Sequence, residues 1–203
     1  MGKEGSADMS IQAMKRTLRQ RIIADRAELS QDERAQLSRE IAARLLRLDA
    51  YHAANTVLGY MNFAAEFESE SWVRQTLSDG KVLLLPKVNK ETRKLDLYCV
   101  TDVDAQLVPG AFGIREPMPQ SCAAARLEEA DFILLPGVAF GRDGARLGYG
   151  GGFYDKVLAR LTHSPTLVAA AYAMQVVEGI PQEETDHTVQ WLVTENETIH
   201  CTG

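Results

Sequence analysis

The chain has 203 residues, of which 45% are hydrophobic and 25% are charged, so a single core can bury about 70% of the unfolded surface. The formal net charge of −6 disfavours a role that depends on contact with a nucleic-acid backbone, because such proteins usually present a basic face to the phosphates. No apolar run is long enough to span a bilayer, and the first residues lack the apolar core of a signal peptide. We therefore expect a cytoplasmic protein with no nucleic-acid and no membrane partner.

Two amphipathic helices are predicted near the start of the chain. Residues 1–8 are small, polar and glycine-containing, so we expect a flexible lead-in there and a single domain over residues 9–203. The apolar residues of the first helix recur at helical spacing and are Ile11, Met14, Leu18 and Ile22. Ser30 and Glu33 then form a capping-box pattern, which predicts the start of a second helix that continues to Leu48.

Beyond the second helix the pattern changes to short apolar runs of strand length. These runs are 56–60, 82–85, 95–100, 132–135, 167–171 and 191–193. Helical patterns lie between several of them, most clearly at 71–77 and 154–161. Strands that alternate with helices favour parallel pairing, so we predict an α/β fold made of one three-layer domain with a mainly parallel central sheet. Residues 116–125 are the most loop-like interior segment.

A glycine-rich loop follows the apolar run at 132–135 and leads into the helical pattern at 154–161. Its alternate glycines, Gly148, Gly150 and Gly152, permit positive φ and let backbone N–H groups approach an anion. The spacing matches neither the dinucleotide fingerprint nor the P-loop, so a flexible surface turn stays open as an alternative. The flanking residues favour a phosphate site, because Arg146 offers a fixed charge and Asp155 offers a carboxylate for Mg²⁺.

The same region resembles the signature of the 5-formyltetrahydrofolate cyclo-ligases, which are also called 5,10-methenyltetrahydrofolate synthetases. The matching residues are Pro136-Gly137-x-Ala139-Phe140 and Gly144-x-Arg146-Leu147-Gly148-x-Gly150-x-Gly152-x-Tyr154-Asp155. Further landmarks of the family follow in order along the chain: Lys15-x-x-Leu18-Arg19, the loop 60–68, Gly113-Ile114-x-Glu116-Pro117, Pro181-x-Glu183-x-x-Asp186-x-x-Val189 and Thr194-Glu195. The resemblance covers nearly the whole chain, and it implies a fold related to ribose-5-phosphate isomerase and CoA-transferase domains.

By this resemblance the chain is expected to convert 5-formyltetrahydrofolate into 5,10-methenyltetrahydrofolate, with ATP as co-substrate and Mg²⁺ as cofactor. The formyl oxygen is phosphorylated, N10 attacks the activated carbon, and phosphate leaves as the ring closes. Phosphoryl transfer needs positioning and charge neutralisation more than a protein nucleophile, so glycine N–H groups, cations and Mg²⁺ are sufficient. We expect a monomer that acts on a small-molecule folate, with or without a polyglutamate tail.

The resemblance also implies which residues hold ATP. The ATP-binding set is Lys15, Arg19, Arg146, Gly148, Gly150, Gly151, Gly152 and Tyr154. Lys15 and Arg146 are expected to be catalytic. Lys15 and Arg19 lie four residues apart and so share a helix face, from which they can reach the phosphates and the glutamate tail of the substrate. An ordinary solvated basic face is the alternative for this pair.

For the folate and the metal, the resemblance implies two further sets. The substrate-binding set is Arg19, Met61, Glu66, Tyr149, Phe153 and Tyr154. Glu66 is expected to accept hydrogen bonds from pterin N–H groups, with Glu68 as a nearby competitor, while the rings stack on a flat heterocycle. Asp155 and Asp186 match the family's magnesium positions, and a helix-start acid stays open as the alternative for Asp155.

Three positions depart from the family pattern. The family commonly has histidine where this chain has Thr185, and aspartates where it has Gly141 and Gln190. His187 is interpreted as a surface residue. The alternatives for function are an ATP-dependent ligase or kinase acting on another pterin or amide, a catalytically silent binding module, and an oxidoreductase on a Rossmann-type unit. The glycine spacing counts against the last of these.

Overall fold

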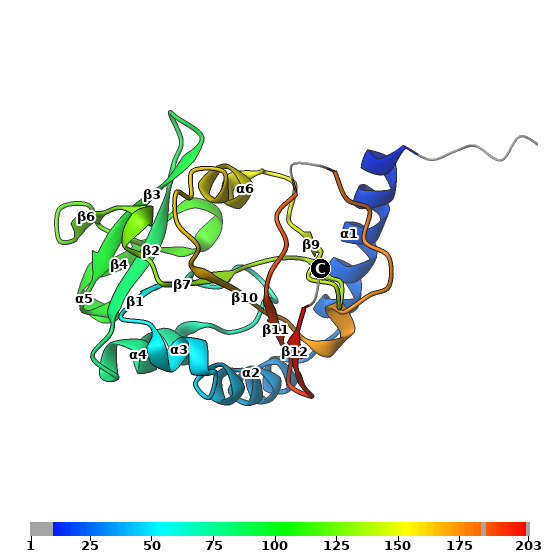
Figure 1. The fold of residues 1–203 in the computed structure, drawn as a ribbon, viewed down its shortest axis with the longest axis horizontal. Helices are drawn as coiled ribbons and strands as arrows, with labels where there is room; N and C mark the ends of the chain where they lie inside the picture. Colours follow the sequence, from blue (N-terminus) through cyan, green and yellow to red (C-terminus); the bar gives the residue numbers. More distant parts are fainter. Residues whose placement is uncertain (1–9, 184–185, 202–203) are drawn as a thin grey trace, which may run out of the picture.

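The computed structural model describes residues 10–183 and 186–201 and contains a central eight-stranded sheet (Figure 1). The strand order is β12-β11-β10-β7-β1-β2-β3-β6. The bounds are β1 Thr56–Leu58, β2 Val82–Asn89, β3 Lys94–Val100, β6 Ala123–Ala125, β7 Phe132–Leu135, β10 Thr166–Ala170, β11 Trp191–Val193 and β12 Thr198–His200. The pairs from β11 through β10, β7 and β1 to β2 are parallel, and the outer pairs are antiparallel. The predicted mainly parallel sheet is confirmed.

Helices cover both faces of this sheet, which gives the three predicted layers (Figure 1). The helices are α1 Ile11–Ala27, α2 Gln31–Leu45, α3 Asp49–Ala53, α4 Glu70–Ser78, α5 Val103–Gln106 and α6 Phe153–Leu158. Alternation along β7 sends Phe132 and Leu134 toward α2, α3 and α4, and sends Ile133 and Leu135 toward α6. None of the helices formed by residues 10–183 and 186–201 is long and apolar enough to cross a membrane.

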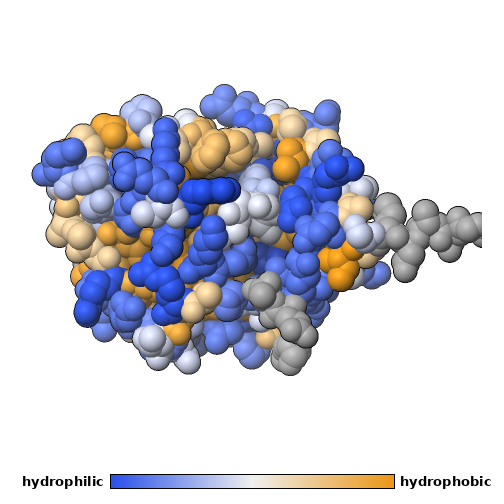
Figure 2. All heavy atoms as spheres, turned by 90° about the horizontal axis from the view of Figure 1, so that it is seen from above, coloured by the Kyte–Doolittle hydropathy of each residue, from blue (hydrophilic) through white to orange (hydrophobic). Residues whose placement is uncertain are grey.

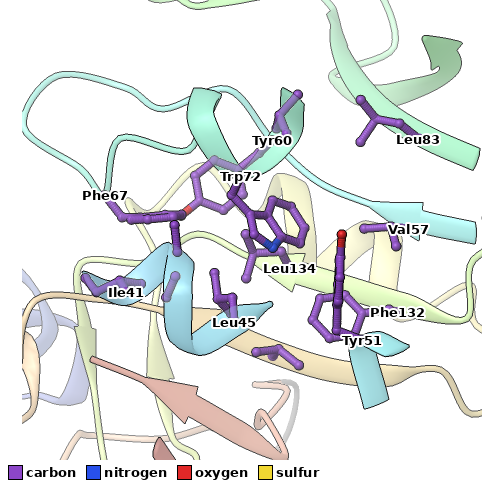
Figure 3. Packing of buried hydrophobic residues seen from close by; sticks show 14 of the residues in the cluster. Ile41, Leu45, Tyr51, Val57, Tyr60, Phe67, Trp72, Leu83, Phe132 and Leu134 are labelled. Carbon is purple, nitrogen blue, oxygen red and sulfur yellow. The ribbon is translucent and has the colours of Figure 1, made fainter. Parts of the chain in front are cut away.

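Aromatic rings fill the layer beneath α3 and α4 (Figure 3). Tyr51 and Trp72 are almost completely buried, and their ring centroids lie 6.0 Å apart. Phe132 on β7 packs against both rings. Hydrophilic side chains cover most of the opposite, outward face, and hydrophobic residues show only in separate groups between them (Figure 2). The apolar surface is therefore concentrated between the layers, where its removal from water stabilises the fold.

The helix α1 packs beside the sheet, across a small two-stranded sheet of β8 (Ala139–Phe140) and β9 (Arg146–Leu147). Ser10 caps its first turn by accepting a hydrogen bond from the Ala13 amide. The buried side chains of α1 are Lys15, Ile22 and Arg26, whereas Ile11 is 41% exposed. The buried face of α1 is therefore rotated relative to the predicted apolar face, because two basic side chains, Lys15 and Arg26, lie on the side that packs against the protein.

Several local details differ from the sequence prediction. The capping box of Ser30 and Glu33 is confirmed, but the second predicted helix ends at Leu45 and α3 follows as a separate helix. The segment 116–125, expected to be a loop, contains the end of β5 (Arg115–Pro117), which pairs with β4 (Leu107–Pro109), and all of β6. Strands of two or three residues carry no detectable period. The predicted lead-in and Thr185 lie outside the described residues.

Candidate active site

The glycine loop joins β9 to α6, close to the carboxyl end of β7. Gly150 and Gly152 have φ of 95° and 63°, which side chains with a Cβ rarely adopt. A Cβ at Gly151 would lie only 2.9 Å from the Phe153 ring, so this position also favours glycine. The predicted order of strand, glycine loop and helix is present, with the β8–β9 hairpin inserted between strand and loop. The backbone around Gly150 is therefore exposed for close approach by a ligand.

A cavity of about 430 Å³ opens beside this loop. Its lining includes these predicted residues: Met61, Glu66, Arg146, Gly148, Tyr149, Gly150, Gly151, Gly152, Phe153, Tyr154 and Asp155. Residues distant in the sequence thus meet at one site. The cavity is also lined by residues that sequence reasoning did not assign: Tyr60, Phe63, Pro86, Val88, Leu95, Phe112, Ile114, Arg115, Glu116 and Pro136. The walls are mostly apolar with a few charged groups, which is the usual character of a small-molecule site.

Arg146 places a buried positive charge at the loop end of the cavity. Its side chain is 3% exposed, donates a hydrogen bond of 3.3 Å to the Pro136 carbonyl, and forms an ion pair with Asp155. The Nε atom of Arg146 has no partner among the described residues. A buried donor without a partner is unfavourable, so this guanidinium has capacity for another acceptor, such as a phosphate oxygen.

Lys15 is also buried, at 4% exposure, but it is held by carboxylates of the C-terminal region. Its Nζ lies 2.9 Å from Glu183 Oε2 and 2.6 Å from Asp186 Oδ2. Burial alone would lower the pKa of Lys15, yet hydrogen bonds and charges from Asp186 and Glu183 raise it. Burial likewise opposes ionisation of Asp186, but Lys15 brings the pKa of that carboxyl below its usual value. Lys15 and Asp186 lie outside the cavity lining and form a separate charged cluster.

Arg19 connects α1 to the glycine loop. Its Nε donates a 2.7 Å hydrogen bond to the Gly148 carbonyl, and its guanidinium lies near Gly150. The predicted metal residues Asp155 and Asp186 are each paired with a cation, Arg146 and Lys15 respectively. Across residues 10–183 and 186–201, no three His, Cys, Asp or Glu side chains gather into a metal-binding group. Any Mg²⁺ would therefore be held by one or two carboxylates together with phosphate oxygens, which is a common arrangement.

Glu66 supplies a buried carboxylate at the other end of the cavity. It is 5% exposed, and its Oε2 accepts a 2.7 Å hydrogen bond from the Phe63 amide. Burial raises the pKa of Glu66, although hydrogen bonds from Phe63 and Tyr149 and the charge of Arg26 act in the opposite direction. Glu68 is absent from the lining, so the structure favours Glu66 over its competitor.

Aromatic rings form the rim next to Glu66. The Phe63 ring packs edge-on against Tyr149 at 5.8 Å and against Phe112 at 6.4 Å. Phe112 is 70% exposed and has φ of 57°, an unusual value for a residue of this size. Met61 is buried beneath this rim at 6% exposure. These side chains offer flat apolar surfaces to a heterocycle.

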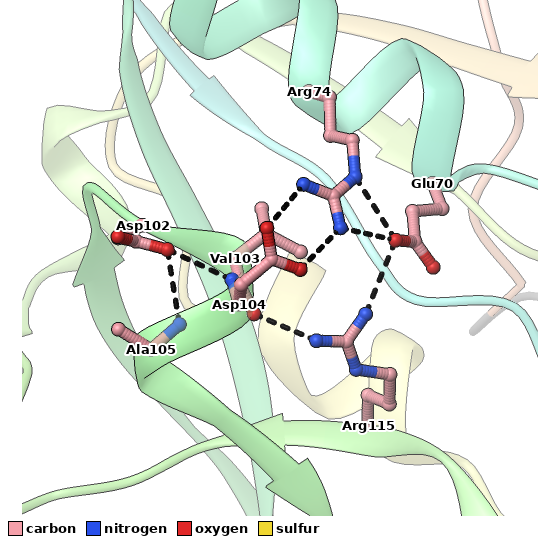
Figure 4. A network of polar contacts seen from close by, with 7 residues as sticks. All are labelled: Glu70, Arg74, Asp102, Val103, Asp104, Ala105 and Arg115. Atoms are coloured by element: carbon pink, nitrogen blue, oxygen red, sulfur yellow. Dashed lines mark hydrogen bonds and ion pairs between the residues drawn. The ribbon is translucent and has the colours of Figure 1, made fainter.

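An ion-pair network fixes the far wall (Figure 4). Arg115 lines the cavity and donates to Glu70 Oε1 at 3.2 Å and to the Val103 carbonyl at 2.7 Å. Glu70 and Asp104 also bind Arg74, which ties α4 to α5. Beside Arg115, the buried Glu116 lies 3.4 Å from the Lys87 ammonium. The predicted motif at 113–117 lies on this wall and contains both Arg115 and Glu116, but their pairing with Glu70 and Lys87 depends on tertiary contacts.

Two of the positions that depart from the family pattern have structural roles. Gln190 Oε1 accepts a 2.8 Å hydrogen bond from the Leu167 amide and so joins the ends of β10 and β11. A Cβ at Gly141 would lie 2.2 Å from Asp143 Oδ1, so a larger residue there would displace the Asp143 side chain. Gly141, Gln190 and His187 are all absent from the cavity lining.

Comparisons with known proteins show what this chain is similar to. A model of the 5-formyltetrahydrofolate cyclo-ligase family matches residues 11–195. The 5-formyltetrahydrofolate cyclo-ligase of Escherichia coli (strain K12) is 29% identical, over 83% of this chain and 93% of its own. The protein of the same name from Mycolicibacterium smegmatis is 32% identical, over 70% of this chain and 74% of its own. The NMR structure of Aquifex aeolicus 5,10-methenyltetrahydrofolate synthetase shares 35% identity and a TM-score of 0.82, over 94% of both chains.

Proposed function

Because the chain belongs to the 5-formyltetrahydrofolate cyclo-ligase family, we propose that it closes 5-formyltetrahydrofolate to 5,10-methenyltetrahydrofolate with the consumption of ATP. The observation that carries this proposal is that one cavity contains both a glycine loop with a buried arginine, Arg146, and a buried carboxylate, Glu66. The first arrangement suits phosphates and the second suits a pterin. A reaction that transfers a phosphoryl group onto a folate needs both within reach of each other.

At the folate end, Glu66 would accept hydrogen bonds from ring N–H groups while Met61 and the aromatic rim cover the flat faces of the pterin. A carboxylate that already accepts one backbone hydrogen bond, from Phe63, is fixed in orientation before the ligand arrives. Pre-organisation of this kind lowers the entropy lost on binding. The formyl group on N5 would then be presented to the loop that holds ATP.

At the nucleotide end, the N–H groups around Gly150 and the guanidinium of Arg146 would surround the phosphates. Arg146 has an unpartnered buried Nε, so charge that develops on the transferred phosphoryl group would find a donor already in place. Arg19 would approach the same phosphates, because it already contacts the loop at Gly148. Lys15 would join them if ATP took it from Asp186 and Glu183.

Magnesium fits the residues present in one respect, because Asp155 and Asp186 provide the hard oxygen donors that it prefers. When bound, the ion would neutralise phosphate charge during transfer. In the ligand-free protein Asp155 is paired with Arg146. The ion pair uses only the Oδ1 atom of Asp155, so the carboxylate would bind the ion through its other oxygen or by releasing Arg146 to the phosphates.

The chemistry follows from these placements. The formyl oxygen attacks the terminal phosphorus of ATP, and ADP leaves with the bond electrons. N10 then attacks the activated formyl carbon and loses its proton to solvent, the carbon–oxygen bond breaks, and inorganic phosphate departs with the bond electrons as the five-membered ring closes. The protein supplies position and charge rather than a nucleophile, which is sufficient for a phosphoryl transfer of this type.

The test is to mix the protein with 5-formyltetrahydrofolate, Mg²⁺ and ATP, and to follow the methenyl product by its ultraviolet absorbance. We expect product only when nucleotide and divalent ion are both present, with one ADP released for each product. Product formed without nucleotide would contradict the phosphorylation mechanism. ADP release with other pterins or amides, but none with 5-formyltetrahydrofolate, would instead favour a ligase or kinase of different substrate.

A further inference from the structure

Arg26, in the last turn of α1, is a buried cation whose charge is not matched by a neighbouring carboxylate. It is 2% exposed, and its Nη2 donates a 2.6 Å hydrogen bond to the Tyr149 hydroxyl. Its Nε and Nη1 atoms are buried without a partner among the described residues, and Arg26 takes part in none of the ion pairs formed there. Burying an unpaired charge is expensive, and the negative end of the α1 dipole offsets only part of that cost.

The nearest use for this charge is at the folate end of the cavity. The guanidinium lies over the Tyr149 ring, with its carbon 5.7 Å from the centroid. Tyr149 and Glu66 both line the cavity. Phe63 lies between them, because its ring packs against Tyr149 at 5.8 Å and its amide donates a hydrogen bond to Glu66. Arg26 itself is behind this wall. From the protein interior toward the cavity, the order is thus Arg26, Tyr149 and Glu66. This row of residues connects the end of α1 to the proposed pterin carboxylate.

We propose that Arg26 is a positioning residue that fixes the Tyr149 side chain in the cavity wall near Glu66, and that its buried charge acts on the carboxylate that would accept hydrogen bonds from the substrate. The proposal rests on the proposed function, because it uses the pterin as the group that Glu66 meets. It assigns a role to a residue that touches neither the cavity nor the reacting atoms. A purely structural alternative exists, in which Arg26 only joins α1 to the glycine loop.

The groups that face Glu66 determine the sign of the expected effect. Burial raises the pKa of Glu66, whereas the Phe63 amide, the Tyr149 hydroxyl and the charge of Arg26 lower it. The hydroxyls of Tyr60 and Tyr154 also face this carboxylate, and burial keeps the pKa of both well above the working range, so they stay neutral. Arg26 therefore supplies the positive charge that acts on Glu66. Removing that charge must raise the pKa of Glu66 further.

The experiment compares Arg26→Met with Arg21→Met, which removes the same charge from an exposed position on the same helix. Carbon-13 NMR of glutamate-labelled, ligand-free protein would follow the Glu66 carboxyl, assigned by its loss in Glu66→Gln. We expect Arg26→Met to move the Glu66 titration midpoint upward by about one pH unit, and Arg21→Met to leave it in place. At pH values below both midpoints, the ionised fraction of Glu66 in Arg26→Met is about a tenth of that in the native protein. The apparent KM for 5-formyltetrahydrofolate should therefore rise by a similar factor.

If Arg26→Met does not fold, two further variants test the effect of Arg26 and Tyr149 on the Glu66 midpoint. Arg26→Lys keeps the charge and should keep the midpoint near that of the native protein, whereas Tyr149→Phe removes the hydroxyl and should raise it. An unchanged midpoint in folded Arg26→Met, or in Tyr149→Phe, would overturn the proposal and leave Arg26 as a structural link. Because the titration is done without folate, it stands apart from the proposed function, which fails only if the native protein makes no methenyl product.

Discussion

The pairing of Asp155 with Arg146 allows a sharp test of the nucleotide end. Asp155→Asn keeps the size of the side chain and one oxygen acceptor but removes the charge that faces a guanidinium of 3% exposure. Breaking a fully buried ion pair costs about 3–5 kcal/mol, and breaking an exposed one costs about 0–1 kcal/mol. The Asp155 carboxylate is 36% exposed, so water compensates part of the loss. We expect the free energy of unfolding of the ligand-free protein to fall by about 1–2 kcal/mol.

Urea unfolding measures this loss, with Asp32→Asn as the matched control. Asp32 is an exposed acid in the first turn of α2, so its replacement reports the effect of the helix dipole alone, about 0.3–1 kcal/mol. A double-mutant cycle with Arg146→Met should show coupling on the order of 1 kcal/mol between the two residues. In turnover, the Mg²⁺ concentration for half-maximal rate should rise on the order of tenfold, the equivalent of about 1.4 kcal/mol of binding free energy.

The reasoning would be refuted if Asp155→Asn lost no more stability than Asp32→Asn, showed no coupling to Arg146, and kept the native dependence on Mg²⁺. Asp155 would then be an acid at the start of a helix and nothing more. If Asp155→Asn lost stability but kept the native Mg²⁺ dependence, the ion pair with Arg146 would be supported and the role of Asp155 in metal binding would be excluded. The two measurements thus separate the two proposed partners of one carboxylate.

Two other substitutions test opposite ends of the cavity. Arg146→Ala removes a charge that would strengthen its contact in the transition state, so kcat/KM should fall by about a hundredfold or more, and a loss below about threefold in a folded variant would exclude Arg146 from the site. Glu66→Gln should weaken binding of 5-formyltetrahydrofolate in calorimetric titration while ATP affinity, measured without folate, changes little. Burial raises the pKa of Glu66, so the native protein loses stability as pH rises through that pKa. The Tm of Glu66→Gln should therefore rise relative to that of the native protein as the pH increases above the ordinary glutamate pKa of 4.5, and a difference that stays constant with pH would contradict this.

The strands of the central sheet could be predicted because the pattern of apolar residues in the sequence matches the burial of those strands. The run Phe132 to Leu135 is apolar at every position, as expected for a strand covered on both faces, and it forms β7. The proposed nucleotide half of the site comes from residues that are adjacent in the sequence, from Arg146 to Asp155. Their order along the chain is the order in which the chain passes from β9 through the loop to α6.

The folate half could be predicted only at isolated points, because it is assembled from segments far apart in the chain. Phe63 and Phe112 meet at the rim although about fifty residues separate them. Phe63 comes from a loop and Phe112 from the short 3-10 helix Ala111–Gly113. Arg115 is directed by bonds to Glu70 and to a backbone carbonyl of α5, which depend on how α4 and α5 pack. A local sequence pattern cannot predict such contacts, because tertiary packing determines the directions of these side chains.

The helix α1 shows why apolar spacing alone misplaced the buried face of the first helix. Lys15, Ile22 and Arg26 are spaced by seven and four residues, so they share one face, and that face is buried. Basic residues normally mark the solvent side of an amphipathic helix, but here each one is buried for a different reason. Lys15 is neutralised by Glu183 and Asp186 and can act on phosphates only after leaving them. Arg26 has no such partner among residues 10–183 and 186–201, so its charge remains available to act on Glu66. One helix face therefore serves both ends of the proposed site.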